Sequence, residues 1–214
     1  MSDYSSLQDF LYRADQFLDP ISGQTRLREV GDLELVPETD RSGIRPAAVL
    51  IPIIPRPSGP TALFTKRPDT MAAHPGQVAF PGGKVEAEDR DDVAAALREA
   101  AEEVGVIPET VELVARAAPY ITGSAFRITP VVGLLPADFV AQPDPQEVAA
   151  TFETPLDFLL NVNNHKSGSA FWMGQERTYY EIPWQGFRIW GVTAGIIRDL
   201  YSNLYQKNSS EEKI

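Results

Sequence analysis

Three glutamates, Glu99, Glu102 and Glu103, lie within five residues of one another in the alanine-rich segment 92–104. Residues three and four positions apart share one face of a helix, so Glu99 and Glu103 are expected side by side, with Glu102 further round. Like charges at this spacing destabilise a helix by about 0.2–0.5 kcal/mol per pair. The segment contains no lysine that could relieve this repulsion, and the spacing therefore indicates a cation site.

The residues on either side of this segment suit a ligand site. Gly82 and Gly83 follow a proline and predict a tight loop whose backbone can approach a ligand closely. Acidic residues that suit a helix N-terminus come next, namely Asp89, Asp91 and Asp92. Gly105 suits the C-cap of the helix. A glutamate-rich helix face is often merely solvated, but these neighbours favour a site.

From Gly83 onward the chain resembles the signature of the Nudix hydrolases. That signature is a glycine, five residues, a glutamate, seven residues, and then Arg-Glu-apolar-x-Glu-Glu-x-Gly-apolar. The fixed positions of its second half are filled here by Arg98, Glu99, Ala100, Glu102, Glu103, Gly105 and Val106. The first half departs, because Asp89 stands in place of the glutamate and one additional residue precedes Arg98.

This longer spacing between Gly83 and Arg98 is similar to that of the coenzyme A diphosphatase branch of the family. Residues 63–67, LFTKR, and 74–84, HPGQVAFPGGK, resemble the additional motif of the branch. Residues 120–133, YITGSAFRITPVVG, resemble its downstream motif, with Ala125 in place of the usual glycine. The spacer between the upstream segments departs at Pro68, Met71 and Ala72 and lacks one expected basic side chain. The resemblance covers roughly residues 40 to 205.

The resemblance implies a site for Mg²⁺ or Mn²⁺. Glu99 and Glu103 are the strongest candidates for metal ligands, and Glu102 would assist directly or through water. The carbonyl oxygen of Gly83 would complete the ligand set, which agrees with the preference of hard divalent cations for oxygen. Arg98 would orient a neighbouring carboxylate rather than bind the substrate.

The chemistry implied is attack of a metal-activated water on one phosphorus atom of a diphosphate. A carboxylate has to accept the proton of that water. Because Nudix enzymes place this base variously, Glu99 and the later Glu147 are both candidates. Glu147 is equally well interpreted as a plain surface charge.

Basic side chains near these motifs could gather the phosphates of a substrate. The candidates are Lys66, Arg67, His74, Lys84 and Arg127. Each basic chain can also be read as merely solvated, and His74 as a residue that fixes its loop. The other histidine, His165, lies in the polar segment 161–169 and is interpreted as a turn or hydrogen-bonding residue. The aromatic residues of the C-terminal half are more typical of a core or a homodimer contact than of a base-stacking platform; they are Phe171, Trp172, Tyr179, Tyr180, Trp184 and Trp190.

The overall composition narrows the class of partner. A net charge of −11 argues against generic binding to nucleic acid or to an anionic membrane, so a phosphate substrate needs metal or local cations. The chain has no apolar run long enough to span a bilayer and no secretory signal. It has no cysteine, which excludes disulfides and thiol catalysis. We therefore expect a cytoplasmic protein with a small-molecule substrate and without nucleic-acid or membrane partners.

A chain of 214 residues with 43% apolar residues permits one well-buried domain. We expect an N-terminal helix and linker-like extension at 1–40, a Nudix hydrolase domain at 41–207 and a polar tail at 208–214. The expected helices are 4–18, a glutamate-bearing helix ending at 104, a short one from Pro155, and 192–205. The expected strands are 47–54, 62–66, 111–118, 128–135, one near 147–154, and a hairpin of 179–182 with 187–190, with 57–60 as a turn. This order predicts an α/β fold with a mixed sheet between helices, and the resemblance implies the Nudix α/β/α sandwich.

The sequence therefore predicts metal-dependent hydrolysis of a diphosphate bond, in coenzyme A or in its acyl or oxidised derivatives. The products would be phosphopantetheine and adenosine 3',5'-bisphosphate. One alternative is a Nudix hydrolase of another nucleoside diphosphate derivative, such as ADP-ribose, or of a nucleoside triphosphate. A second is a non-catalytic Nudix module that binds a nucleotide as a regulator, and the intact glutamates argue against it.

Overall fold

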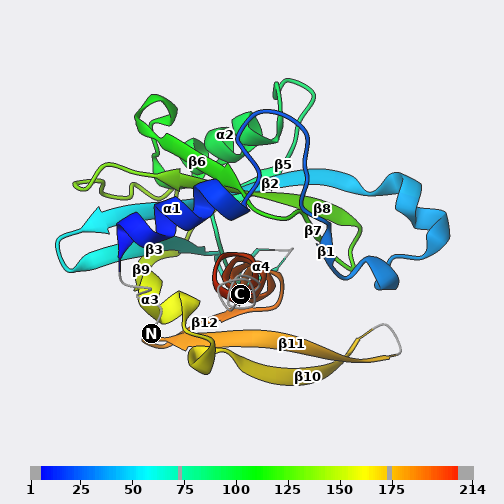
Figure 1. Ribbon diagram of the computed structural model, residues 1–214. Helices are drawn as coiled ribbons and strands as arrows, with labels where there is room; N and C mark the ends of the chain where they lie inside the picture. The colour runs from blue at the N-terminus through cyan, green and yellow to red at the C-terminus, as the bar shows by residue number, and fades with distance from the viewer. Residues whose placement is uncertain (1–5, 72–73, 173–174, 207–214) are drawn as a thin grey trace, which may run out of the picture.

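The computed structural model describes residues 6–71, 74–172 and 175–206 (Figure 1). The predicted polar tail, 208–214, lies outside the described residues. In the described part of the chain, no helix is long and apolar enough to cross a membrane.

A nine-stranded mixed sheet forms the centre of the molecule. Its strands are β1 (Val30–Gly31), β2 (Arg45–Arg56), β3 (Gly59–Lys66), β4 (Val78–Ala79), β5 (Gly82–Lys84), β6 (Glu112–Arg116), β7 (Tyr120–Ile121), β8 (Phe126–Leu134) and β9 (Ala150–Pro155). The order β1-β7-β8-β2-β3-β4 is joined by β5 on β2, β6 on β8 and β9 on β3. The pairs β2/β8 and β1/β7 are parallel and the others antiparallel, so the predicted mixed sheet is confirmed.

Helices cover both faces of this sheet (Figure 1). They are α1 (Leu7–Phe17), α2 (Asp92–Val104), α3 (Leu156–Leu160) and α4 (Val192–Tyr201), which continues as a π-helical turn, Ser202–Gln206. Short 3-10 turns occupy Leu33–Leu35, Glu38–Gly43, Pro108–Thr110 and Val162–Asn164. A second sheet of β10 (Lys166–Trp172), β11 (Gln175–Trp184) and β12 (Phe187–Trp190) lies beyond α4.

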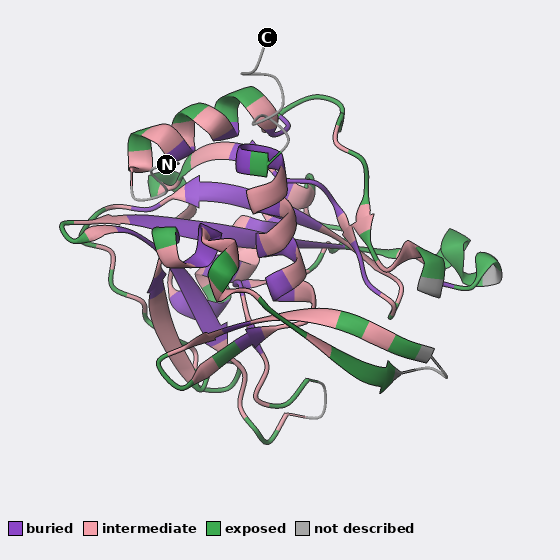
Figure 2. Cartoon of the chain, turned by 60° about the horizontal axis from the view of Figure 1, so that its bottom comes forward, coloured by how far each residue is buried: buried purple, intermediate pink, exposed green. Residues whose placement is uncertain are grey.

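The side chains of β2 show how the two layers of helices are held. Leu50 and Ile54 belong to the core beneath α2, whereas Ile51 and Ile53 belong to the core shared with α1 and α4. Successive side chains of a strand point to opposite faces, so an almost wholly apolar strand fits a sheet covered on both sides. Figure 2 shows the resulting buried layer along the sheet. The predicted α/β/α sandwich with an N-terminal helix is confirmed.

The N-terminal extension packs into the same core as the rest of the chain. Phe10 and Ala14 of α1 are fully buried in it. Asp19 is also buried, and its carboxylate accepts hydrogen bonds from the backbone N–H groups of Arg26 and Leu27. Asp19 and Arg116 exchange backbone hydrogen bonds, and β1 extends the sheet beside β7. The domain boundaries at residues 40/41 and 207/208 stay predictions.

The structure corrects three details of the predicted elements. Gly82 and Gly83, expected in a tight loop, belong to the short strand β5. The turn expected at 57–60 is shorter, because β3 already begins at Gly59 and only residues 57–58 connect it to β2. No strand was predicted in the polar segment 161–169, but β10 begins at Lys166 and pairs along its length with β11. The interpretation of His165 is confirmed, since its Nε2 lies 2.6 Å from the carbonyl oxygen of Leu159.

Most of the described aromatic side chains of the C-terminal half pack within the molecule. The indole N–H of Trp184 donates to the carbonyl oxygen of Glu153. Tyr180 packs against the main core, and the rings of Tyr179 and Trp190 are in edge contact. Phe171, at 78% exposure, is the exception. The side chain of Trp172 lies outside the described part of the structure.

Candidate active site

The glutamate-bearing helix α2 is bounded as the sequence predicts. Asp91 is its N-cap, and its carboxylate accepts a hydrogen bond of 2.8 Å from the N–H of Ala94. At the other end Gly105 adopts φ 72°, and its N–H donates to Ala101. Only glycine takes this left-handed conformation readily. These caps fix where the three glutamates stand on the helix.

The glycine pair of β5 lies directly against two of the glutamates. The N–H of Gly82 donates to Oε2 of Glu103 over 3.3 Å. A Cβ atom at Gly83 would overlap the carboxyl group of Glu99, so any larger residue at this position would displace that carboxyl group. Strand β5 runs antiparallel to β2, with Ala48 opposite Gly83. The sheet therefore holds the glycines in place while α2 presents Glu99 and Glu103 to them.

Arg98 connects the acidic groups around the start and middle of α2. Its Nε and Nη2 each donate to one oxygen of Asp89 over 3.0 Å. Its Nη1 donates to Glu99 and to Glu102, also over 3.0 Å each, and Nη2 donates to the carbonyl oxygen of Lys84. Hydrogen bonds from Arg98 hold the pKa of Asp89 below its usual range. Arg98 thus orients carboxylates, as the resemblance implies.

The two inner glutamates, Glu99 and Glu103, are costly to ionise. Glu103 is only 3% exposed, and burial raises its pKa to about 8. The N–H of Gly82 and the guanidinium of Arg67 oppose this rise, whereas the charges of Glu99 and Glu147 add to it. Burial likewise raises the pKa of Glu99 against the hydrogen bond from Arg98. With all of its carboxylates ionised, the cluster would carry more negative charge than Arg67 and Arg98 neutralise.

Glu147 reaches this cluster from a loop that is docked on the end of α2. The N–H groups of Gln142 and Asp144 donate to the last carbonyl oxygens of the helix, on Val104 and Glu103. The carbonyl oxygen of Asp144 in turn accepts from the N–H of Glu147. The charge of Glu147 raises the pKa of both Glu99 and Glu103, so it lies near both. Its side chain is exposed and open to a ligand.

The donor set of this cluster fits a hard divalent cation. Glu99, Glu103 and the carbonyl group of Gly83 offer oxygen ligands, and the excess negative charge favours a cation. Among the described residues, no three histidine or acidic groups are already gathered closely enough to enclose a metal ion. Mg²⁺ does not need such a cage, because it usually takes one or two carboxylates together with waters and substrate phosphate oxygens. A bound ion would neutralise phosphate charge and lower the pKa of a water.

A cavity of about 220 Å³ adjoins the cluster on the α4 side of the sheet. Its walls are formed by residues of several segments, including parts of β2 and α4: Val49, Arg67, His74, Gln77, Ala79, Phe80, Gly82, Thr122, Ser124, Phe126, Ile128, Val192, Thr193 and Ile196. Arg67 joins the two sites, because it lines the cavity while its Nη1 lies 3.9 Å from Oε1 of Glu103. Its buried Nε has no hydrogen-bond partner among the described residues.

The predicted substrate-binding residues divide into two groups. Arg67 and His74 line the cavity. Lys66, Lys84 and Arg127 do not: Lys66 pairs with an aspartate over 3.2 Å, and Arg127 pairs with Glu29 over 2.7 Å. Lys84 is exposed on β5, beside the cavity.

Several lining residues were not identified from the sequence as site residues. They are Gln77, Thr122, Ser124 and Phe126. All four lie inside the two segments that resemble the motifs of the coenzyme A diphosphatase branch. The motif positions themselves were therefore the signal that could have found them.

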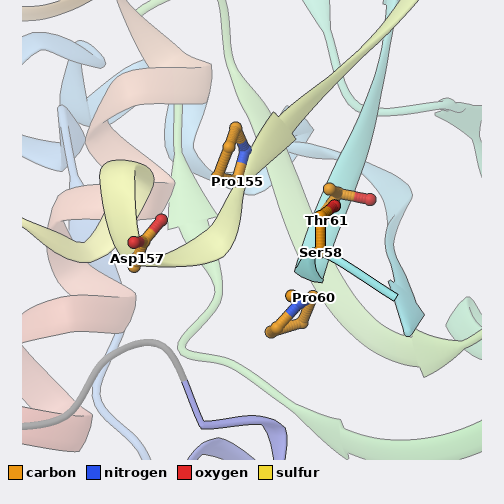
Figure 3. Close-up of a pocket in the computed structure, with 6 residues that line it drawn as sticks. Ser58, Pro60, Thr61, Pro155 and Asp157 are labelled. Atoms are coloured by element: carbon orange, nitrogen blue, oxygen red, sulfur yellow. The ribbon is translucent and has the colours of Figure 1, made fainter. Parts of the chain in front are cut away.

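A second cavity, of about 200 Å³, lies at the turn between β2 and β3 (Figure 3). Ser58, Pro60 and Thr61 face Pro155 and Asp157 across it. No predicted site residue lines this cavity, and Asp157 is its only ionisable side chain. It lacks both the cations and the carboxylate cluster that phosphate chemistry requires.

Comparisons with known proteins identify the family of this chain. The NUDIX domain family matches residues 44–191. "Uncharacterized Nudix hydrolase NudL" of Enterobacter sp. (strain 638) is 44% identical over 156 residues, 73% of this chain and 81% of its own. Its namesake in Cronobacter sakazakii is 41% identical over 81% of this chain and 91% of its own. The crystal structure of a MutT protein from Methanosarcina mazei Go1 is 13% identical over 89% of this chain and all of its own, with a TM-score of 0.46.

The family match covers well over half of the chain and includes the glycine pair, α2 and the loop that carries Glu147. Nudix hydrolases act on small nucleotide substrates and generally use divalent metal ions. The chain belongs to the Nudix hydrolase family and is an enzyme that hydrolyses a nucleoside diphosphate derivative.

Proposed function

We propose that this enzyme hydrolyses the diphosphate bond of coenzyme A, or of its acyl or oxidised derivatives. One water is consumed, and the products are phosphopantetheine and adenosine 3',5'-bisphosphate. The observation that carries the proposal is that both segments resembling the coenzyme A diphosphatase branch, 74–84 and 120–133, contribute to the walls of one cavity. That cavity meets the glutamate cluster at Gly82 and Arg67.

In this proposal Glu99, Glu103 and the carbonyl group of Gly83 hold Mg²⁺ or Mn²⁺. Glu102, more than half exposed, assists through water. Arg98 keeps Glu99 and Glu102 in position through its hydrogen bonds. A bound ion supplies neutralising charge and an acidified water.

Glu99 or Glu147 accepts the proton of the attacking water. Glu147 is suited to this role because it is exposed and close to both inner glutamates. Arg67 and His74 bind the diphosphate at the cavity wall. Lys66, Lys84 and Arg127 add positive potential around the substrate, which matters in a protein of net charge −11.

A hydrolysis panel tests the substrate. The purified enzyme is assayed with Mg²⁺ or Mn²⁺ against coenzyme A, acyl-coenzyme A, ADP-ribose, dinucleoside polyphosphates and nucleoside triphosphates, and the products are identified. We expect adenosine 3',5'-bisphosphate from coenzyme A substrates and no turnover with a chelator. Turnover of ADP-ribose or a triphosphate alone would reassign the enzyme to another Nudix substrate.

The same assay excludes a purely regulatory role. An enzyme loses most of its turnover when Glu103 becomes glutamine, whereas a nucleotide-binding regulator shows binding without turnover and is indifferent to the change. Glu109→Gln is the matched control, since Glu109 is exposed and lies outside the cluster. Equal rates for the two variants would contradict the proposed site.

A further inference from the structure

Arg45 is a positively charged residue at the edge of the cavity. It is the first residue of β2 and lies opposite Phe126 in the parallel register with β8. Its guanidinium carbon is 3.9 Å from the centre of the Phe126 ring, and its Nη2 donates to the carbonyl oxygen of Ser124 over 3.2 Å. Phe126 and Ser124 both line the cavity, so Arg45 contacts two residues of the cavity wall.

The charge of Arg45 is not neutralised within the described structure. No carboxylate of a described residue lies within ion-pair distance of it, whereas Arg56, Arg98 and Arg127 are each paired with one or more. A guanidinium has five N–H donors, and the described contacts of Arg45 use one of them. An unpaired guanidinium beside a cavity, in a chain of net charge −11, is suited to an anionic ligand.

The strand register aligns Arg45 with the glutamate cluster. Gly82 lies opposite Val49, and Lys84 lies opposite Ala47. Directly opposed side chains share a face, and alternate residues of a strand do so too, so Lys84 and Arg45 lie on the same face as Val49. Val49 lines the cavity. It lies four positions along β2 from Arg45, a span of about 13 Å between Cα atoms.

Lys84 extends this arrangement into a row of two cations. It makes no ion pair with a described residue, and it lies between Gly82, where the cluster begins, and the level of Arg45. A substrate whose diphosphate lies at Gly82 and Arg67 would therefore extend past Lys84 toward Arg45. A second anionic group at that distance would meet unneutralised charge.

We propose that Arg45, with Lys84 beside it, binds a phosphate group of the substrate that is separate from the cleaved bond. This inference rests on the proposed function, because coenzyme A carries such a group on its ribose, at the 3' position. The terminal phosphate of a nucleoside triphosphate has the same chemistry and would be the other source. ADP-ribose has no such group, and the subsite would discriminate against it.

Coenzyme A and 3'-dephospho-coenzyme A differ only in the proposed ligand group and give the first test. Arg45→Gln lowers kcat/KM for coenzyme A by about 10- to 100-fold, the size expected for loss of a charge-assisted contact, and lowers that for dephospho-coenzyme A by less than about threefold. Arg45→Lys retains part of the preference. Arg188→Gln removes one positive charge on β12, where Glu181 already pairs it, and leaves both rates unchanged. Equal losses on the two substrates would overturn the subsite.

Binding without turnover separates this inference from the proposed function. Calorimetry compares adenosine 3',5'-bisphosphate, AMP and ATP on the wild type and Arg45→Gln. A preference for the bisphosphate over AMP that disappears in Arg45→Gln supports the subsite, even if coenzyme A is not a substrate. An Arg45-dependent preference for ATP alone keeps the anion subsite and overturns its assignment to the ribose phosphate. Equal binding of AMP, bisphosphate and ATP by the wild type overturns the subsite, even if coenzyme A is hydrolysed.

Discussion

Two clusters of arginine and glutamate in this molecule are built from the same chemical groups but differ in their balance of charge. In the first, Arg56 and Glu153 form two hydrogen bonds, of 2.5 and 3.0 Å, and Thr61 donates to the same carboxylate. The remaining donors of Arg56 reach the carbonyl oxygens of Ala137 and Phe139. The hydrogen bond from Arg56 holds the pKa of Glu153 below its usual range.

In the second cluster, the carboxyl groups outnumber the arginines. Arg98 is shared by Asp89, Glu99 and Glu102, and Glu103 has only Arg67 at 3.9 Å. Burial raises the pKa of both inner glutamates.

The comparison separates a structural ion pair from a ligand site. The half-buried pair of Arg56 and Glu153 is matched in charge and holds β2, β9 and the loop at residues 137–139 together. A buried cluster with excess charge is destabilised until a cation arrives, which is the pattern expected at a functional site. Burial, with a smaller contribution from neighbouring charges, raises the pKa of Glu99 and Glu103, whereas the hydrogen bond from Arg56 lowers that of Glu153.

Replacing one glutamate in each cluster should lower activity in one variant and stability in the other. Glu103→Gln lowers kcat on the order of 10³-fold, because it removes a charged ligand of the metal ion proposed to act on the reacting phosphate, and it leaves the free energy of unfolding equal or higher. Glu153→Gln leaves kcat within about threefold and lowers the free energy of unfolding by about 1–3 kcal/mol, because the guanidinium of Arg56 loses its partner. Steady-state kinetics and urea denaturation of both variants measure the two effects. A similar rate loss in both would remove the distinction.

The two clusters should also give opposite dependences of stability on pH in metal-free protein. Glu103 has a folded pKa of about 8, above its ordinary 4.5, so its contribution is present below pH 4.5 and is lost as the pH rises toward 8. The slope is at most about 1.4 kcal/mol per pH unit. Glu153 has a lowered pKa, so its contribution is present above pH 4.5 and is lost as the pH falls below it.

Thermal unfolding in the presence of a chelator checks both slopes. In Glu103→Gln, the unfolding temperature should no longer fall between about pH 5 and 8 but should still fall in acid. In Glu153→Gln, it should still fall between about pH 5 and 8 but should fall less in acid. Added Mg²⁺ should restore stability at pH 8 in the wild type. If stability still falls between about pH 5 and 8 in Glu103→Gln, a group other than Glu103 causes that dependence on pH.

The parts of the second cluster that could be predicted are local in sequence. Glu99 and Glu103 share a helix face because they are four residues apart, and the caps of α2 follow from Asp91 and Gly105. Each of these features depends on residues within one or two helical turns. Gly83 was predicted from the resemblance, and its contact with Glu99 was not visible in spacing alone.

The parts that could not be predicted depend on strand register. Arg56 meets Glu153 across 97 residues, and Arg45 meets Phe126 through a parallel pairing with no turn to fix it. The strand β10 also escaped prediction, because Ser167, Gly168 and Ser169 lack an apolar alternation. Its conformation is imposed by the partner strand β11.

Gly83→Ala tests whether the close contact between β5 and α2 shapes the cluster. The new Cβ would overlap the carboxyl group of Glu99 and displace it, so we expect a loss of about 10- to 100-fold in kcat, the size found when the partners of metal ligands are removed. Gly43→Ala is the matched control, since a Cβ there meets no atom within 4 Å. The ion pair of Arg56 and Glu153 should be unaffected in both variants. Full activity of Gly83→Ala would place the ligand set elsewhere on α2.

Glu102→Gln should have the smallest effect, and it tests whether Glu102 belongs to the ligand set formed by Glu99 and Glu103. The side chain of Glu102 is 57% exposed, and its described contact is the hydrogen bond to Arg98. A solvent-exposed pair of this kind contributes about 0.3–0.5 kcal/mol, so thermal unfolding should hardly change. If Glu102 acts through water, kcat falls by about tenfold or less, as for a residue outside the direct ligand set. A loss as large as that of Glu103→Gln would make Glu102 a direct ligand and extend the cluster to the solvent-exposed face of α2.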